Sequence, residues 1–133
     1  MLVGILLTVA ILVGCLVLCF TGNVTVNCGE ESFAVEADYY GDFQCAYADV
    51  CSIEYREFFD GGSRTAGFGS PRLSLGQFKN EELGSYLRYG YTECSAVILL
   101  QIEGDRVVAI SGRDVAETKA IYETLLSKIT GTY

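Results

Sequence analysis

Histidine and tryptophan are both missing from the 133 residues of the chain, and proline occurs only once. Without histidine, a Ser-His-Asp triad, a Cys-His nucleophilic pair and the usual histidine metal sites are all excluded. Basic residues are few, since 9 Lys and Arg stand against 17 Asp and Glu for a net charge of −8. Nucleic acid is therefore excluded as a partner, because its phosphate backbone requires a basic surface. These absences predict a protein that is not an enzyme and holds no cofactor or metal.

Charged side chains are also missing from the first 21 residues, where only Thr8 interrupts an apolar run from Leu2 to Phe20. About 19 helical residues match the roughly 30 Å hydrocarbon core of a bilayer. We therefore expect residues 1–21 to form a transmembrane anchor, which makes the chain a single-pass protein of the cell membrane. Two processing alternatives stay open, a cleaved signal peptide and a lipoprotein signal with its cleavage box at Leu12 to Cys15. The missing basic start speaks against both alternatives.

The side of the membrane that the domain faces is left open by the sequence. Lys and Arg next to a membrane helix set its orientation, but the first basic residue is Arg56, far from the helix. Four cysteines lie in the domain, at Cys28, Cys45, Cys51 and Cys94. They fit either two disulfides or free thiols, and we favour free thiols because a domain of this size does not need cross-links. This gives a weak preference for the cytoplasmic side.

Alternating apolar and polar residues predict that residues 22–133 form one mainly-β domain. Val24–Cys28 and Ser32–Asp38 form a hairpin across Gly29 to Glu31, and further strands are predicted at Val50–Phe58 and Leu83–Tyr91. The stretch 61–76 has five glycines and the single proline, so it should be irregular or bulged strand. A phosphate-binding loop is not expected there, because no helix follows the glycines.

The most distinct hairpin predicted joins residues 96–103 to residues 106–111 across Gly104 and Asp105. With a two-residue turn, Glu103 opposes Arg106 as an ion pair, Ile102 opposes Val107 and Leu100 opposes Ala109. The five apolar residues from 96 to 100 predict a strand covered on both faces, by the barrel interior and by a C-terminal helix.

That helix is predicted at about residues 114–130. Asp114 provides an N-cap, and Glu117 three positions later completes a capping box. The stripe expected to dock onto the sheet consists of Val115, Thr118, Tyr122, Leu125 and Ile129.

Several short segments together carry a family resemblance. They are Tyr40-Gly41, Asp49-Val50, Ser52-Ile53-Glu54, Arg64 to Gly69, Gly76-Gln77-Phe78, and Val107 to Asp114 leading into Glu117-Thr118. With these segments the chain resembles the bacterial pleckstrin-homology-like (PH-like) domain family of membrane-anchored proteins. The resemblance covers residues 24–129 and implies a bent, seven-stranded antiparallel barrel with one C-terminal α-helix. It implies no catalytic activity. Eukaryotic relatives often bind phosphoinositides through a basic first hairpin loop, whereas the loop here is Gly29-Glu30-Glu31, which disfavours that ligand.

A basic, aromatic patch on the middle strands is the candidate partner-binding site. Its predicted members are Arg64, Arg72, Lys79, Arg88, Phe68, Tyr86 and Tyr89. The alternative is that these residues are ordinary solvated edges. We accordingly predict a membrane-tethered PH-like module that binds a protein partner or a second copy of itself. A structural subunit of a larger membrane complex and a thiol-based redox protein are the alternative functions.

Overall fold

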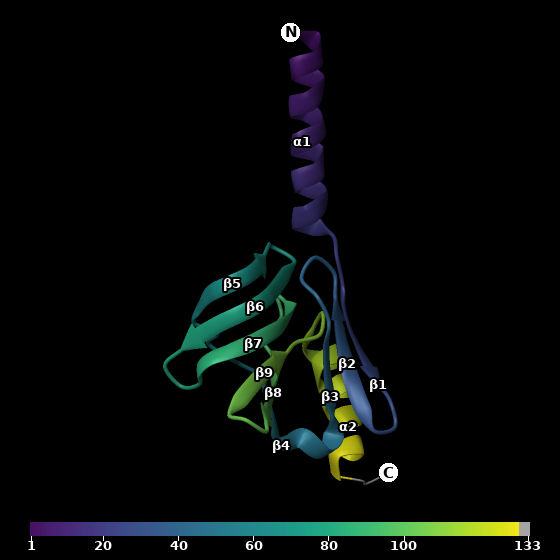
Figure 1. Ribbon diagram of the computed structural model, residues 1–133, viewed down its shortest axis with the longest axis vertical. Coiled ribbons are helices and arrows are strands. Elements are labelled where there is room, and N and C mark those ends of the chain that lie inside the picture. The colour runs from purple at the N-terminus through teal and green to yellow at the C-terminus, as the bar shows by residue number, and fades with distance from the viewer. Residues whose placement is uncertain (131–133) are drawn as a thin grey trace.

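Short strands make up most of the chain between residues 24 and 110 in the computed structural model, with a helix at each end (Figure 1). The structure describes residues 1–130, without the side chains at positions 18 and 19, so the last three residues of the predicted domain lie outside it. The elements are α1 (Leu2–Phe20), β1 (Val24–Cys28), β2 (Ser32–Ala37), β3 (Phe43–Ala46), the 3₁₀ turn η1 (Tyr47–Asp49), β4 (Val50–Arg56), β5 (Ser63–Gly69), β6 (Leu73–Asn80), β7 (Gly84–Tyr91), β8 (Val97–Ile102), β9 (Arg106–Ile110) and α2 (Val115–Thr130).

The strands form two sheets. The smaller sheet has the order β1-β2-β3 and the larger has the order β4-β8-β9-β7-β6-β5. Neighbouring strands are antiparallel except for β7 and β9, which run parallel because the β8–β9 hairpin inserts β9 between β8 and β7. The predicted mainly-β fold with a C-terminal helix is confirmed. The seven-stranded, wholly antiparallel arrangement is wrong, since the described residues form nine strands with one parallel pair.

Two of the strands depend on pairing rather than on their own sequence pattern. β3 has only four residues and pairs with β2, and the glycine-containing β5 pairs with β6. Gly67 and Gly76 face each other across β5 and β6, and a Cβ on either would meet a backbone oxygen at 2.3 Å. The glycines that predict irregular chain therefore let two backbones approach closely. The predicted bulge is present, at the register shift between Arg64 and Ala66.

The main core lies between the two sheets and α2. Phe33 and Val35 from β2, Leu75 from β6, Leu100 from β8 and Leu125 from α2 are each 1% exposed or less. Helix α2 contacts β1 in the small sheet and β4 and β8 in the large one, so it closes the opening between them. Each such side chain gains about 1.5–3 kcal/mol by leaving water, which makes this core the main source of stability.

A second, smaller cluster covers the opposite face of the six-stranded sheet. Its buried members are Phe78, Tyr86, Val97, Leu99 and Ala109. The predicted burial of residues 96–100 on both faces is confirmed, because none of them is more than 6% exposed. The predicted second cover is wrong: α2 packs on the main core, and Phe59 from the β4–β5 loop packs on the smaller cluster instead.

The N-terminus of α2 is capped as predicted. The Asp114 Oδ1 atom accepts a hydrogen bond from the Glu117 N–H at 2.8 Å. The Glu117 carboxylate pairs with Arg113 at 2.9 Å, so the expected capping box is replaced by an ion pair one residue earlier. This pair also fixes the segment that joins β9 to α2.

The apolar stripe of α2 is confirmed except at its first member. Thr118 and Leu125 are fully buried, and Tyr122 packs against the main core. Val115 is 39% exposed and does not belong to the stripe, whereas Ile121 does pack against the core. The stripe therefore starts one turn later than predicted.

The β8–β9 hairpin has a register one residue away from the predicted one. The observed pairs include Ile102–Arg106, Gln101–Val107, Leu100–Val108 and Leu99–Ala109. This register places Leu100 opposite Val108, which shares the main core with it, whereas Ala109 belongs to the other cluster. A one-residue slip would reverse these faces. No Glu103–Arg106 ion pair occurs among the described residues, and Arg106 Nε donates to the Glu103 carbonyl oxygen at 3.5 Å instead.

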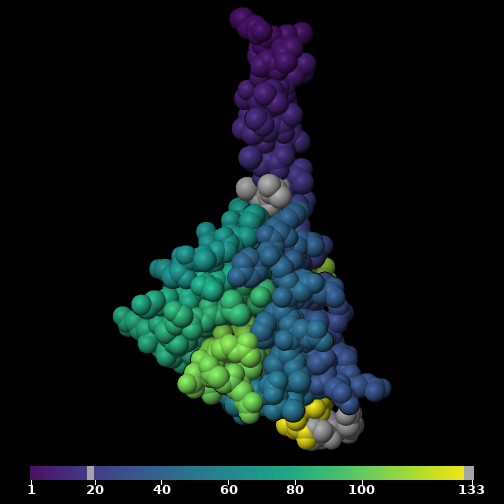
Figure 2. Space-filling model, in the orientation of Figure 1, coloured from purple at the N-terminus to yellow at the C-terminus, as the bar shows by residue number. Residues whose placement is uncertain are grey.

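Helix α1 projects away from the rest of the molecule (Figures 1 and 2). All of the large hydrophobic side chains that the structure describes in α1 are exposed. Their exposed fractions run from 49% at Val17 to 78% at Val3. In the described part of the chain, no helix is long and apolar enough to cross a membrane. The predicted helix is therefore present, but its assignment as a transmembrane span is not supported.

Candidate functional site

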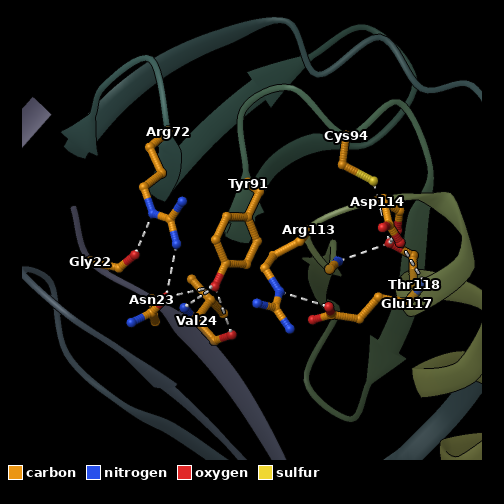
Figure 3. A network of polar contacts seen from close by, with 11 residues as sticks. Gly22, Asn23, Val24, Arg72, Tyr91, Cys94, Arg113, Asp114, Glu117 and Thr118 are labelled. Atoms are coloured by element: carbon orange, nitrogen blue, oxygen red, sulfur yellow. Dashed lines mark hydrogen bonds and ion pairs between the residues drawn. The ribbon is translucent and has the colours of Figure 1, made fainter. Parts of the chain in front are cut away.

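The chain passes from α1 into β1 through residues 21–23, and side chains of the domain hold this passage (Figure 3). Arg72, in the turn between β5 and β6, donates from Nε to the Gly22 carbonyl oxygen at 2.7 Å and from Nη2 to Asn23 Oδ1 at 2.9 Å. The Arg72 guanidinium carbon also lies 5.3 Å from the centroid of the Tyr91 ring. We call Gly22, Asn23, Val24, Arg72 and Tyr91 the α1 junction.

Tyr91 anchors the start of β1 from the neighbouring sheet. Its ring is buried, and its hydroxyl accepts a hydrogen bond from the Val24 N–H at 3.0 Å. The same hydroxyl lies within donating distance of the Val24 carbonyl oxygen, at 3.4 Å. A net hydrogen bond contributes only about 1 kcal/mol, so the junction is held by the number of its contacts rather than by one strong bond.

The turn between β2 and β3 also forms hydrogen bonds with residues 21–23, which join α1 to β1. The Asn23 N–H donates to Asp38 Oδ2 at 2.9 Å, and the Asp38 N–H donates to the Asn23 carbonyl oxygen at 3.1 Å. The hydroxyls of Thr21 and Tyr39 are 2.8 Å apart. Gly22 itself has φ +98°, and a Cβ there would lie 2.6 Å from the Tyr39 ring. Three segments far apart in the sequence thus fix where α1 leaves the domain.

A second polar group lies next to the junction, where β9 leads into α2 (Figure 3). Arg113 forms its ion pair with Glu117, and the hydrogen bond to this carboxylate raises the pKa of Arg113 above its usual value. The Thr118 hydroxyl donates to the Asp114 carbonyl oxygen at 2.8 Å and lies 3.3 Å from the Sγ atom of Cys94. These contacts hold the segment that carries Arg113, which lines the same cavity as Tyr91.

A cavity of about 270 Å³ opens between these two groups and the end of α1. It is lined by Phe20, Pro71, Arg72, Tyr91, Glu93 and Arg113. Figure 3 shows Arg72 and Arg113 on either side of the Tyr91 ring. The cavity therefore combines two guanidinium groups, one carboxylate and two aromatic rings at the point where the apolar helix meets the domain.

The structure separates the aromatic members of the predicted patch. Tyr86 is 4% exposed in the smaller cluster and Tyr89 is 3% exposed in the main core, on opposite faces of the sheet. Burial raises the pKa of both phenols, which keeps them neutral. Phe68 packs against the main core, with its ring centroid 5.4 Å from that of Tyr39. These three rings are therefore packing residues and do not line a common surface.

The basic members of the patch are also divided. Arg72 belongs to the α1 junction, and the Arg88 guanidinium lies over the rings of Phe59 and Phe78, at 5.9 and 5.4 Å from their centroids. Arg88 Nε is buried and has no hydrogen-bond partner among the described residues. Only Arg64 and Lys79 are exposed and lie on the paired strands β5 and β6. Of the seven predicted residues, these two are the ones that a partner could reach easily.

The cysteines give little support to a thiol-based redox function. The free cysteines of the described side chains are Cys15, Cys28, Cys45, Cys51 and Cys94. Burial raises the pKa of Cys28 and Cys45, so both remain protonated at neutral pH, and a protonated thiol is a poor nucleophile. The described residues contain no group of three or more potential metal-ligating side chains.

The sequence predicts Arg72 as a site residue, but it does not predict the residues that surround Arg72 in the structure. The spacing of Arg113 and Glu117 is that of a helical ion pair and was a usable local signal. Tyr91 and Val24 are separated by 67 positions, so no local pattern indicates their contact. The junction could only be found from the folded chain.

Comparison with known proteins gives one match. A family model described as "Bacterial PH domain" matches residues 24–126, which is well over half of the chain and begins at the first strand of the domain. Neither the curated proteins nor the solved structures include a match. The matched range contains both sheets and most of α2, and it leaves out α1. The chain belongs to the bacterial PH domain family.

Proposed function

We propose that the protein is a PH domain tethered to the cell membrane by α1, where it binds a protein partner. The observation that carries the proposal is the surface of α1, on which every large hydrophobic side chain that the structure describes is exposed. Leu6, Leu12 and Leu16 are 62%, 59% and 57% exposed. Such a large continuous apolar surface is not stable in water and indicates contact with lipid or protein.

Two further properties of α1 favour lipid over a protein groove. A helix that is apolar on every side suits a surrounding that is apolar on every side, whereas a docked helix needs only one apolar stripe. The single polar side chain, Thr8, bonds the Gly4 carbonyl oxygen at 2.9 Å and so presents no unpaired hydroxyl to its surroundings.

A charge placed in the middle of α1 tests the tether. Ile11→Arg is expected to move the protein from the membrane fraction to the soluble fraction, because an arginine placed among lipid hydrocarbon costs about 2.5–3.5 kcal/mol, or roughly 100-fold in partitioning. The measurement is the fraction retained in carbonate-washed membranes. Ser95→Arg, on the exposed β7–β8 loop, adds the same charge and should leave that fraction unchanged. Recovery of the wild-type protein in the soluble fraction would refute the tether.

The domain itself provides the binding activity in this proposal. PH domains are in general non-catalytic binding modules, and the raised pKa values of Cys28 and Cys45 give the redox alternative no support. Arg64 and Lys79 are the exposed remainder of the predicted patch. The register puts their side chains on alternate faces of the sheet, but β5 is its edge strand, and we propose that an acidic protein surface contacts both residues across this edge. The acidic first hairpin loop, Gly29 to Glu31, continues to disfavour phosphoinositides as the ligand.

Charge reversal tests this contact. The double variant Arg64→Glu, Lys79→Glu should lower recovery of cross-linked partners from membranes by at least about fivefold, since opposed charges become like charges. The matched control reverses Arg106 and Lys119, one arginine and one lysine that are exposed elsewhere. Equal recovery of cross-linked partners from the two double variants would contradict the proposed contact. If, in addition, both variants retained one partner at a constant ratio of partner to protein, the protein would be a structural subunit of a larger complex.

A further inference from the structure

The cavity at the base of α1 has the composition of a headgroup site. Its about 270 Å³ is slightly below the range of about 300–1,000 Å³ typical of pockets for drug-sized ligands, so it suits a smaller group. Phe20, the last residue of α1, forms part of its lining. If α1 is inserted in lipid, as proposed above, this end of the helix lies where the hydrocarbon gives way to headgroups. The inference rests on that tether.

Both arginines of the cavity retain unused hydrogen-bond donors. Arg72 engages the junction through Nε and Nη2, and Arg113 engages Glu117 through Nε. In the described part of the chain, no hydrogen bond is made by Nη1 of Arg72 or by either Nη of Arg113. Guanidinium N–H groups bind phosphate oxygens through strong charge-assisted hydrogen bonds. Donors of both arginines are therefore available to phosphate oxygens in the cavity that the two side chains line.

The acidic side chain of the cavity selects among phosphate-bearing groups. Glu93 is exposed on the β7–β8 loop and forms no ion pair with any described residue. With Glu117 and Asp114 also close to Arg113, a ligand with several negative charges would be repelled. A ligand that carries an ammonium group next to its phosphate would satisfy Glu93 and the arginines together.

Aromatic side chains lie in the cavity and on the surface next to it. Phe20 and Tyr91 both line the cavity, and the Tyr91 ring is buried with its hydroxyl turned to the junction. Tyr39 and Tyr40, on the β2–β3 turn beside the junction, are 45% and 40% exposed. Tyrosines are enriched where membrane proteins meet the headgroup layer. The end of the domain nearest α1 is therefore suited to contact that layer.

We propose that this cavity binds the headgroup of a zwitterionic phospholipid with a primary ammonium, of the phosphatidylethanolamine type. Arg72 and Arg113 hold the phosphate, and Glu93 accepts hydrogen bonds from the ammonium. A lipid so bound contacts both α1 and the domain, and it sets the orientation of the domain relative to the bilayer surface.

Native mass spectrometry of the full-length protein in detergent tests the site. We expect the wild-type protein to retain dioleoylphosphatidylethanolamine at least about fivefold better than phosphatidylcholine or phosphatidylglycerol, which lack a primary ammonium, since each charge-assisted bond is worth a fold-change of this order. Glu93→Gln should abolish this preference, and Arg113→Gln should weaken retention of all three lipids. Arg72 is left intact in this experiment because it also holds the junction.

Glu103→Gln and Arg106→Gln are the matched controls, since both residues are exposed on the β8–β9 hairpin. They should behave as the wild type. Equal retention of the three lipids by the wild type, or cavity variants indistinguishable from the controls, would overturn the proposal. Competition by soluble glycerophosphoethanolamine at comparable concentration would assign a soluble ligand and overturn the lipid. A membrane-bound protein with no lipid preference refutes this site alone, whereas a protein found in the soluble fraction refutes the tether.

Discussion

Replacing Leu125 by alanine is expected to lower the free energy of unfolding of the domain by about 2–5 kcal/mol. Leu125 is fully buried and projects from α2 into the main core between the two sheets. The shorter side chain would leave a cavity at the place where α2 closes both sheets. Urea unfolding of the full-length protein in detergent, followed by the near-ultraviolet circular dichroism of its tyrosines, measures the loss.

Leu126→Ala is the matched control, because it makes the same change one position further along the same helix. Leu126 is only half-buried and is not among the residues that pack against the main core. Its replacement should cost less than about 1 kcal/mol, because little apolar surface returns to water. Similar losses in the two variants would show that α2 is not held by its packing on the core.

Features that depend on neighbouring residues were predictable from the sequence. The first hairpin, the Asp114 cap and the buried run of residues 96–100 each have a pattern within a few positions. A cap requires a suitable side chain three residues before the N–H that it accepts from, and alternation in a strand repeats every second residue. The structure confirms these elements.

Features that depend on distant residues were not predictable. The β8–β9 register differs by one residue, because the faces of Leu100 and Val108 are set by the core rather than by the turn. The glycines of β5 predict irregular chain rather than a regular strand. The strand forms because Gly67 faces Gly76 of β6, and no pattern of neighbouring residues indicates this pairing. The cover over Leu99 comes from a loop that contains Phe59, about 40 positions earlier in the chain.

The candidate site likewise combines features that neighbouring residues predict with features that depend on residues far apart in the chain. Arg72 could be recognised as a cation, but its partner is the Gly22 carbonyl oxygen, 50 positions away. A single arginine in a predicted loop or strand is compatible both with a role on the surface and with a role in the α1 junction, so the sequence does not distinguish the two roles of Arg72. Tyr86 and Tyr89 are three positions apart on β7, so the alternation of a strand predicts opposite faces for them, and their side chains do point to opposite faces. Alternation therefore argues against a shared patch of these two rings, whereas the contact of Arg72 with Gly22 exists only in the folded chain.

Replacing Gly22 by alanine is expected to destabilise the α1 junction by about 2–5 kcal/mol. The positive φ of +98° costs an L-residue about 1–2 kcal/mol, and forced overpacking typically adds about 1–3 kcal/mol. The overpacking arises because a Cβ would lie 2.6 Å from Tyr39 and 2.8 Å from Leu73. Leu73 is fully buried and cannot move aside without disturbing the main core.

Gly104→Ala separates the two terms of this cost. Gly104 also has a positive φ, of +87°, but a Cβ there meets nothing within 4 Å. It should therefore lose only the backbone term of about 1–2 kcal/mol, and it should leave the junction intact. In the Gly22 variant, α1 would no longer be held at a fixed angle, so proteinase K should cut between α1 and β1 faster than in the wild type or the Gly104 variant. Equal cleavage and equal stability of the two variants would mean that Tyr39 and Leu73 do not confine the passage, and that α1 and the domain move independently.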